Sequence, residues 1–163
     1  MLCKIDHYLK ILYRLSGYIA AIFLIFVATF ILTGIASRIF GFYIRGLAEY
    51  SGYCMAASSF LALAYTFGEK GHIRITLFLE RANKEVRRFL DLWCLSIATF
   101  FSGFLSYYFV KMLIISIQFG ERSEGADEIY IWIPQVTVAL GSTIFFICVL
   151  HNFILLILNR NNN

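Results

Sequence analysis

Long apolar stretches separated by short polar segments run through the chain. Four of these stretches contain no Asp, Glu, Lys or Arg, and they cover residues 15–37, 50–68, 92–110 and 129–159. A helix of about 20 apolar residues crosses a hydrocarbon core of about 30 Å, and a helix satisfies its own backbone groups in lipid. The pattern therefore predicts an all-α integral membrane protein in which residues 1–163 form one domain. The four expected transmembrane helices cover about residues 15–37, 50–68, 89–117 and 129–158.

The segment between the second and third stretches has apolar residues on one face only. They recur at helical spacing and are Ile75, Phe78, Leu79, Ala82, Val86, Phe89 and Leu90. Charged residues fill the other face, as in a helix that lies in the lipid headgroup layer. We expect an amphipathic interfacial helix between transmembrane helices 2 and 3. The alternative is a cytoplasmic extension of helix 3.

Basic residues are distributed unevenly between the two ends of the expected helices. One side has Lys4, Lys10, Arg14, Lys70, Arg74, Arg81, Lys84, Arg87, Arg88 and Arg160. The other side has Arg38, Arg45, Lys111 and Arg122. Because cytoplasmic connections carry the excess of Lys and Arg, both termini are expected in the cytoplasm.

The composition agrees with a membrane location. Apolar residues make up 60% of the chain and charged residues 15%, with a net charge of +4. Soluble proteins have about 25% charged residues, and the basic residues here form short clusters, so we expect membrane lipid and not nucleic acid around the chain. The four cysteines lack the C-x-x-C spacing of a zinc site or a thiol oxidase.

The expected helices carry few residues for chemistry. Their middle parts contain no carboxylate that would bind a proton or a sodium ion, and Pro134 with Gly141 does not make a broken helix. We expect no catalytic residue, no metal ligand, no cofactor and no enzymatic activity. Two alternatives stay open at this point. One is a haem-bearing membrane anchor of a redox complex, with His72 and His151 as axial ligands; the other is an independent small carrier.

Small residues recur at three- or four-residue spacing in the third helix, at Ser96, Thr99, Gly103 and Ser106. Small side chains let helices approach closely in lipid. This row is therefore expected to contact another helix, either of this chain or of a second subunit.

The end of the second stretch carries the most specific motif. It reads Tyr65-Thr66-Phe67-Gly68-Glu69-Lys70-Gly71-His72-Ile73-Arg74-Ile75-Thr76-Leu77. This segment resembles the cytoplasmic signature of the small, DctQ-type membrane subunit of tripartite ATP-independent periplasmic (TRAP) transporters. Glu49, Gly141 and the Trp132-Ile133-Pro134-Gln135 segment are also similar to that family. The chain departs from it at Thr76, where an aspartate is common, and at Glu49, which stands alone where the family tends to have an acidic pair.

The resemblance implies an accessory permease subunit in the bacterial inner membrane. It implies two partners: a large multi-span membrane subunit with the substrate and sodium sites, and a periplasmic substrate-binding protein. The small subunit would brace the large one during sodium-driven uptake of an organic anion, a carboxylate such as a C4-dicarboxylate or sialic acid.

Two sets of interface residues are expected, from the resemblance and from the row of small residues in the third helix. Contacts with the large subunit or with lipid are expected at Gly71, His72, Arg74, Glu49, Ser96, Thr99, Gly103 and Ser106. The binding protein is expected to dock on Glu121, Glu124, Asp127 and Glu128. The alternative for these four acidic residues is a solvated loop that only enforces orientation.

Overall fold

The computed structural model describes residues 2–68, 84–125 and 128–158. The described residues form four helices: α1 (Leu2–Ile39), α2 (Leu47–Gly68), α4 (Lys84–Phe119) and α5 (Trp132–Leu158). The first three expected transmembrane segments fall within α1, α2 and α4. The fourth was expected from residue 129, whereas α5 begins at Trp132, because residues 129–131 pair with the preceding loop.

The expected interfacial helix lies mostly outside the described residues. Its last apolar positions, Val86, Phe89 and Leu90, belong to α4, which runs without a break to Phe119. For this part of the segment the structure has the alternative arrangement, an extension of the third helix. The interfacial helix before it stays a prediction.

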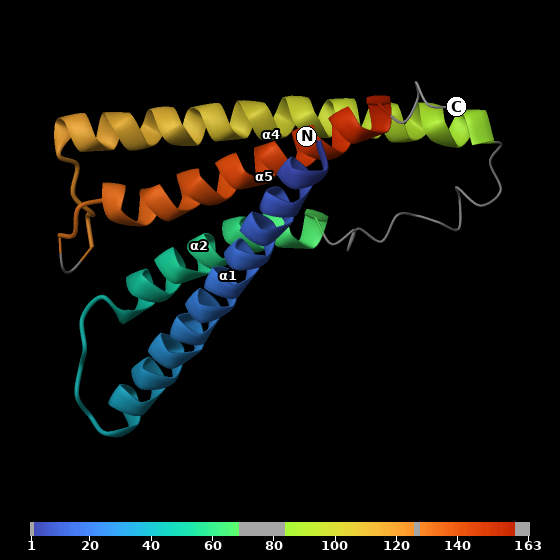
Figure 1. The fold of residues 1–163 in the computed structure, drawn as a ribbon. Coiled ribbons are helices and arrows are strands. Elements are labelled where there is room, and N and C mark those ends of the chain that lie inside the picture. Colours follow the sequence, from blue (N-terminus) through green and yellow to red (C-terminus); the bar gives the residue numbers. More distant parts are fainter. Residues whose placement is uncertain (1, 69–83, 126–127, 159–163) are drawn as a thin grey trace.

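The helices form two antiparallel pairs, α1 with α2 and α4 with α5 (Figure 1). α2 packs against α5 and so joins the two pairs. The connections 40–46 and 120–131 lie at one end of the molecule, which we call the loop end (Figure 1). The start of α1 and the end of α5 lie at the other, the terminal end (Figure 1).

Small residues bring α2 close to both of its neighbours. A β-carbon at Gly17 of α1 would lie 2.7 Å from Cγ of Tyr65. A β-carbon at Gly141 of α5 would lie 2.8 Å from the backbone carbonyl carbon of Phe60. Because neither glycine has a side chain, α1 and α5 can pack closely on α2. The buried residues of α2 are Ala57, Ser58, Leu61 and Ala64.

Hydroxyl and thiol groups form hydrogen bonds between these packed helices. Ser58 Oγ donates to the carbonyl oxygen of Ala20 at 2.9 Å. Cys148 Sγ donates to the carbonyl oxygen of Ala64 at 3.6 Å. Such bonds contribute about 0.6 kcal/mol each between transmembrane helices. They therefore fix the register of the helices more than they add stability.

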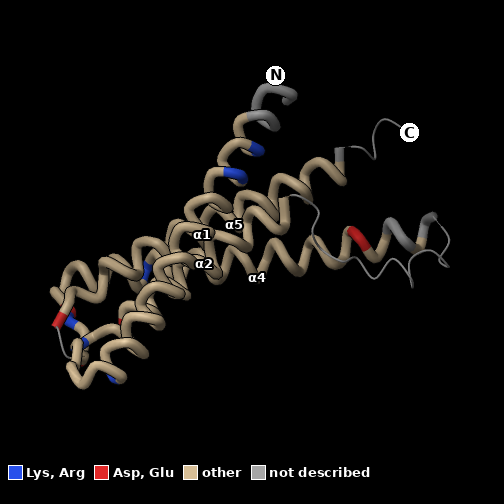
Figure 2. The backbone as a smooth tube through the Cα atoms, turned by 90° about the horizontal axis from the view of Figure 1, so that it is seen from below, with Lys and Arg blue, Asp and Glu red and all other residues tan. Residues whose placement is uncertain are grey.

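Three of the described helical segments are long and apolar enough to cross a membrane: Tyr8–Ile39, Phe89–Phe119 and Trp132–Ile157. The first two have 32 and 31 residues, about 46–48 Å at the rise of an α-helix, so they must tilt or extend beyond the hydrocarbon layer. α2 has 22 residues and is not among these segments. Its crossing of the membrane stays a prediction. Charged residues gather toward the two ends of the described helices (Figure 2).

Candidate interaction surfaces

Residues 120–131, which we call the acidic loop, have a defined backbone structure in their described part. Gly120 has a φ of 61° and ends α4, and the Glu121 N–H donates to the carbonyl oxygen of Ser116 at 3.1 Å, as in a Schellman cap. Beyond the cap, Arg122 and Tyr130 form an antiparallel bridge. The Ser123 N–H donates to the Ile129 carbonyl at 2.7 Å. The described part of the loop is thus a short hairpin, and α5 begins only after it, at Trp132.

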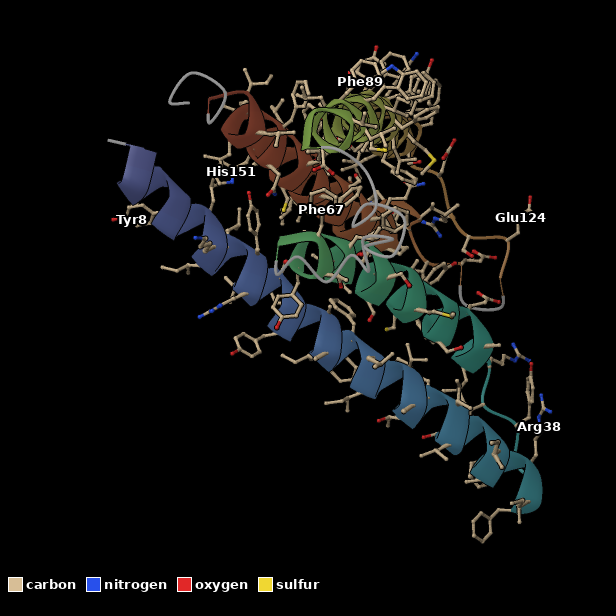
Figure 3. The ribbon with its side chains drawn as sticks, turned by 90° about the vertical axis from the view of Figure 1, so that its right-hand side faces the viewer. Tyr8, Arg38, Phe67, Phe89, Glu124 and His151 are labelled. Atoms are coloured by element: carbon tan, nitrogen blue, oxygen red, sulfur yellow. The ribbon has the colours of Figure 1, made fainter. Side chains whose placement is uncertain are left out.

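The acidic side chains of this loop have different surroundings. Glu121 Oε2 accepts a hydrogen bond of 2.7 Å from Ser116 Oγ. Glu128 lies 3.7 Å from the Arg122 guanidinium in an exposed ion pair. Glu124 is exposed and lies at the outside of the loop (Figure 3), and Asp127 lies outside the described residues. Of the expected docking residues, Glu124 is therefore the most available among those described.

The acidic loop is anchored on α2. Tyr53 Oη and Ser123 Oγ are hydrogen-bonded at 2.9 Å, and Ser123 Oγ also accepts from the Gly125 N–H at 3.2 Å. The Glu49 carboxylate lies against Gly125, where a β-carbon would overlap it. Glu49 was expected at a subunit or lipid interface; in the described residues its carboxylate contacts the acidic loop. Sequence reasoning missed Tyr53, Ser123 and Gly125, because no spacing along the chain links α2 to this loop.

Residues 40–46, which we call the aromatic loop, connect α1 to α2. Phe40, Phe42 and Tyr43 are exposed by 77%, 51% and 82%. A groove of about 390 Å³ lies between the end of α1, this loop and the start of α2. Its walls are mostly apolar, and Arg38 and Glu49 also line it. Arg38 lies at the loop end of α1 (Figure 3).

One face of α2 is left uncovered by α1 and α5. Its residues are exposed, recur at three- or four-residue spacing, and are Ala48, Gly52, Met55, Ser59, Leu63 and Thr66. No atom lies within 4 Å of a β-carbon built at Gly52. We call this surface the α2 face. Sequence reasoning missed it, although the small residues at helical spacing in α2 were a visible signal.

The small residues of α4 pack mainly within this chain. A β-carbon at Gly103 would lie 2.9 Å from Cε2 of Phe146 on α5. The hydroxyls of Ser106 and Thr143 are hydrogen-bonded at 3.0 Å. Thr99 is half-buried, and its hydroxyl donates to the Leu95 carbonyl at 2.7 Å, whereas Ser96 is exposed. Two of the four expected interface residues therefore contact α5 of the same chain, the first of the two expectations.

The motif at residues 65–77 and the pair of His72 and His151 lie only partly within the described residues. Gly71, His72 and Arg74 lie outside the described residues, so their roles stay predictions. His151 is half-buried on α5, toward the terminal end (Figure 3). The described residues contain no group of three or more His, Cys, Asp or Glu that would hold a metal ion.

These features define the class of the protein, and comparison with known families then identifies its family. Long apolar helices with charged residues toward their ends are those of a helical membrane protein. The chain belongs to the family of tripartite ATP-independent periplasmic transporters, DctQ component, whose model matches residues 27–159. The resemblance expected from the motif at residues 65–77 is thereby confirmed. No curated protein and no solved structure matches the chain. This family consists of transporter components that work with a large membrane subunit and a periplasmic binding protein, and it is not a family of enzymes.

Proposed function

We propose that this chain is the small accessory subunit that braces the large transport subunit of a TRAP transporter in the bacterial inner membrane. The complex takes up an organic anion, a carboxylate such as a C4-dicarboxylate or sialic acid. Uptake is driven by sodium and depends on a periplasmic binding protein. Family membership supports the class of transporter, and the α2 face supports the bracing role.

The α2 face is the observation that carries the bracing role. In lipid, exposed Gly52 and Ser59 give a helix little favourable burial, whereas small residues let a helix of another subunit approach closely. A neighbouring subunit on the α2 face would remove this face from lipid. The large transport subunit is the membrane partner that the family provides.

The ionisable residues favour an accessory role over an independent carrier. Coupled carriers usually place a carboxylate or a broken helix at membrane depth. Here residues 15–37, 50–68 and 129–159 contain no carboxylate at all. In α4, Asp91 lies near the beginning of the helix at the terminal end. The substrate and ion sites of the complex are accordingly assigned to the large subunit.

The acidic loop is the proposed docking surface for the binding protein. Its anchoring through Tyr53 and Ser123 holds Glu124 in a defined position relative to α2. Exposed charges mainly steer encounter and set orientation. The competing view is that the loop is only solvated, and salt-dependent kinetics distinguish the two.

Co-purification tests the bracing role. An affinity tag on the large subunit should retain this chain, and Gly52→Trp or Ser59→Trp on the α2 face should lower the retained amount several-fold. Ala28→Trp is the matched control, because Ala28 is an exposed small residue of α1 outside the α2 face. Equal retention of all three variants would remove the α2 face from the interface. Failure of the wild-type chain to co-purify would refute the proposed function itself.

A further inference from the structure

The groove at the loop end combines mostly apolar walls with two charged residues, Arg38 and Glu49. We propose that it holds one molecule of an amino-headgroup phospholipid, phosphatidylethanolamine. The phosphate lies on Arg38, the ammonium faces Glu49, and an acyl chain follows the apolar wall. This assignment does not depend on the transport role of the chain.

The walls of the groove suit an acyl chain. Phe30, Ile31 and Ile35 of α1 and Leu47 of α2 line it. Gly34 leaves room between the two helices, because the nearest atom to a β-carbon built there, Cδ1 of Leu47, is 3.9 Å away. A volume of about 390 Å³ lies within the range of about 300–1,000 Å³ that is typical of small-molecule sites.

The charged residues of the groove suit a zwitterionic headgroup. Arg38 lies in the last turn of α1, and a guanidinium binds phosphate through paired, charge-assisted hydrogen bonds. Glu49 lines the same groove, so a purely anionic headgroup would also meet a residue of like charge. A headgroup with both a phosphate and an ammonium complements both residues.

The position of the groove favours lipid over a soluble ligand. It opens beside the aromatic loop, in which Phe40, Phe42 and Tyr43 are exposed. Aromatic side chains concentrate at the membrane–water interface, where lipid headgroups lie. The groove wall also belongs to α1, whose segment Tyr8–Ile39 is long and apolar enough to span the bilayer. A phospholipid in this layer can reach both the arginine and the apolar wall.

Native mass spectrometry of the full chain tests the assignment. The chain is reconstituted in membranes of equal parts phosphatidylethanolamine and phosphatidylglycerol and released into detergent. Phosphatidylethanolamine should remain bound to the wild type. Arg38→Gln should lower the affinity about tenfold, as expected for a lost charge-assisted hydrogen bond. Arg45→Gln is the matched control, because Arg45 is exposed in the same loop and does not line the groove, and it should retain lipid as the wild type does.

A variant that fills the groove gives an independent test of the lipid site. Gly34→Leu should fill the groove and displace the lipid, whereas Ala28→Leu, at an exposed position of the same helix, should not. Helical circular dichroism confirms that both variants are folded. Equal retention by Arg38→Gln and the wild type would overturn the proposal. Preferential retention of phosphatidylglycerol, or displacement of the lipid by soluble succinate, would also overturn it, the latter by showing a general anion site.

Discussion

Two connections lie at the same end of the molecule, and their structures differ. The acidic loop is a hydrogen-bonded hairpin that is fixed to α2 through Tyr53 and Ser123. The aromatic loop exposes Phe40 and Tyr43 and borders an open groove. Both connect antiparallel neighbours, so topology does not account for the difference.

Their side chains account for it. Polar residues of the acidic loop form hydrogen bonds and an ion pair with one another and with α2. These contacts hold the exposed charges of the loop in defined positions. Aromatic side chains of the other loop are stable at a membrane–water interface. The loop end therefore has two surfaces of different chemistry, and we propose that one meets a soluble protein and the other meets lipid.

The largest expected effect is in cysteine labelling, which should be complete or absent according to the side of the membrane on which a loop lies. In a chain with its four native cysteines replaced by alanine, single cysteines at positions 43 and 124 should react with a membrane-impermeant reagent added from outside. A cysteine at position 84 should not react, because the basic connection is expected in the cytoplasm. Labelling from outside at 84 but not at 124 would reverse the orientation and with it the docking role of the acidic loop.

Gly125→Val should detach the acidic loop from α2. Its side chain would overlap the Glu49 carboxylate, and overpacking of this kind costs about 1–3 kcal/mol. Proteolytic cleavage of the loop in the purified chain should become about tenfold faster, because a locally opened loop is the form that is cut. Gly52→Val is the control, since no atom lies within 4 Å of its β-carbon. Unchanged cleavage in Gly125→Val would show that the contact with Glu49 does not hold the loop.

Neutralising the four acidic residues tests the docking surface. With Glu121, Glu124, Asp127 and Glu128 changed to Gln or Asn, uptake at limiting binding protein should slow several-fold at low salt. The loss should shrink as salt rises, because screening already weakens the wild-type attraction. The maximal rate at saturating binding protein should change little. Glu124→Gln alone should slow uptake more than Glu121→Gln, because the Glu121 carboxylate already accepts a hydrogen bond from Ser116. An unaltered rate at low salt would end the docking hypothesis.

The smallest effect is expected at Arg122. This residue forms an exposed ion pair with Glu128 and lies 4.9 Å from the centroid of the Tyr130 ring. Exposed pairs contribute about 1 kcal/mol or less, so Arg122→Gln should shift the unfolding midpoint of the purified chain only slightly. If Arg122→Gln lowered the unfolding midpoint as much as Gly125→Val does in the same measurement, this ion pair, and not the α2 contact, would be what holds the hairpin.

The sequence predicted the helices well, because they follow from the length and spacing of apolar residues. It also predicted the family, through the motif around Gly71 and Arg74, which the family match confirms. The start of α5 at Trp132 was missed, since the hairpin pairing of Arg122 with Tyr130 depends on a turn that apolar spacing does not record.

The contacts of the candidate surfaces were harder to predict. Glu49 contacts Gly125, and Tyr53 contacts Ser123, which is 70 residues away along the chain. Periodicity within one helix carries no information about such pairs. Gly103 and Ser106 contact α5 of the same chain, and their spacing alone did not decide between α5 and a second subunit.

Reconstituted uptake tests the central claim, that the chain serves transport only as a brace for a larger subunit. Liposomes are prepared with this chain alone, with the large subunit alone, and with both, and the binding protein loaded with a carboxylate is added with a sodium gradient. We predict uptake with both membrane subunits and none with this chain alone. Sodium-driven uptake in liposomes that contain only this chain would contradict the account.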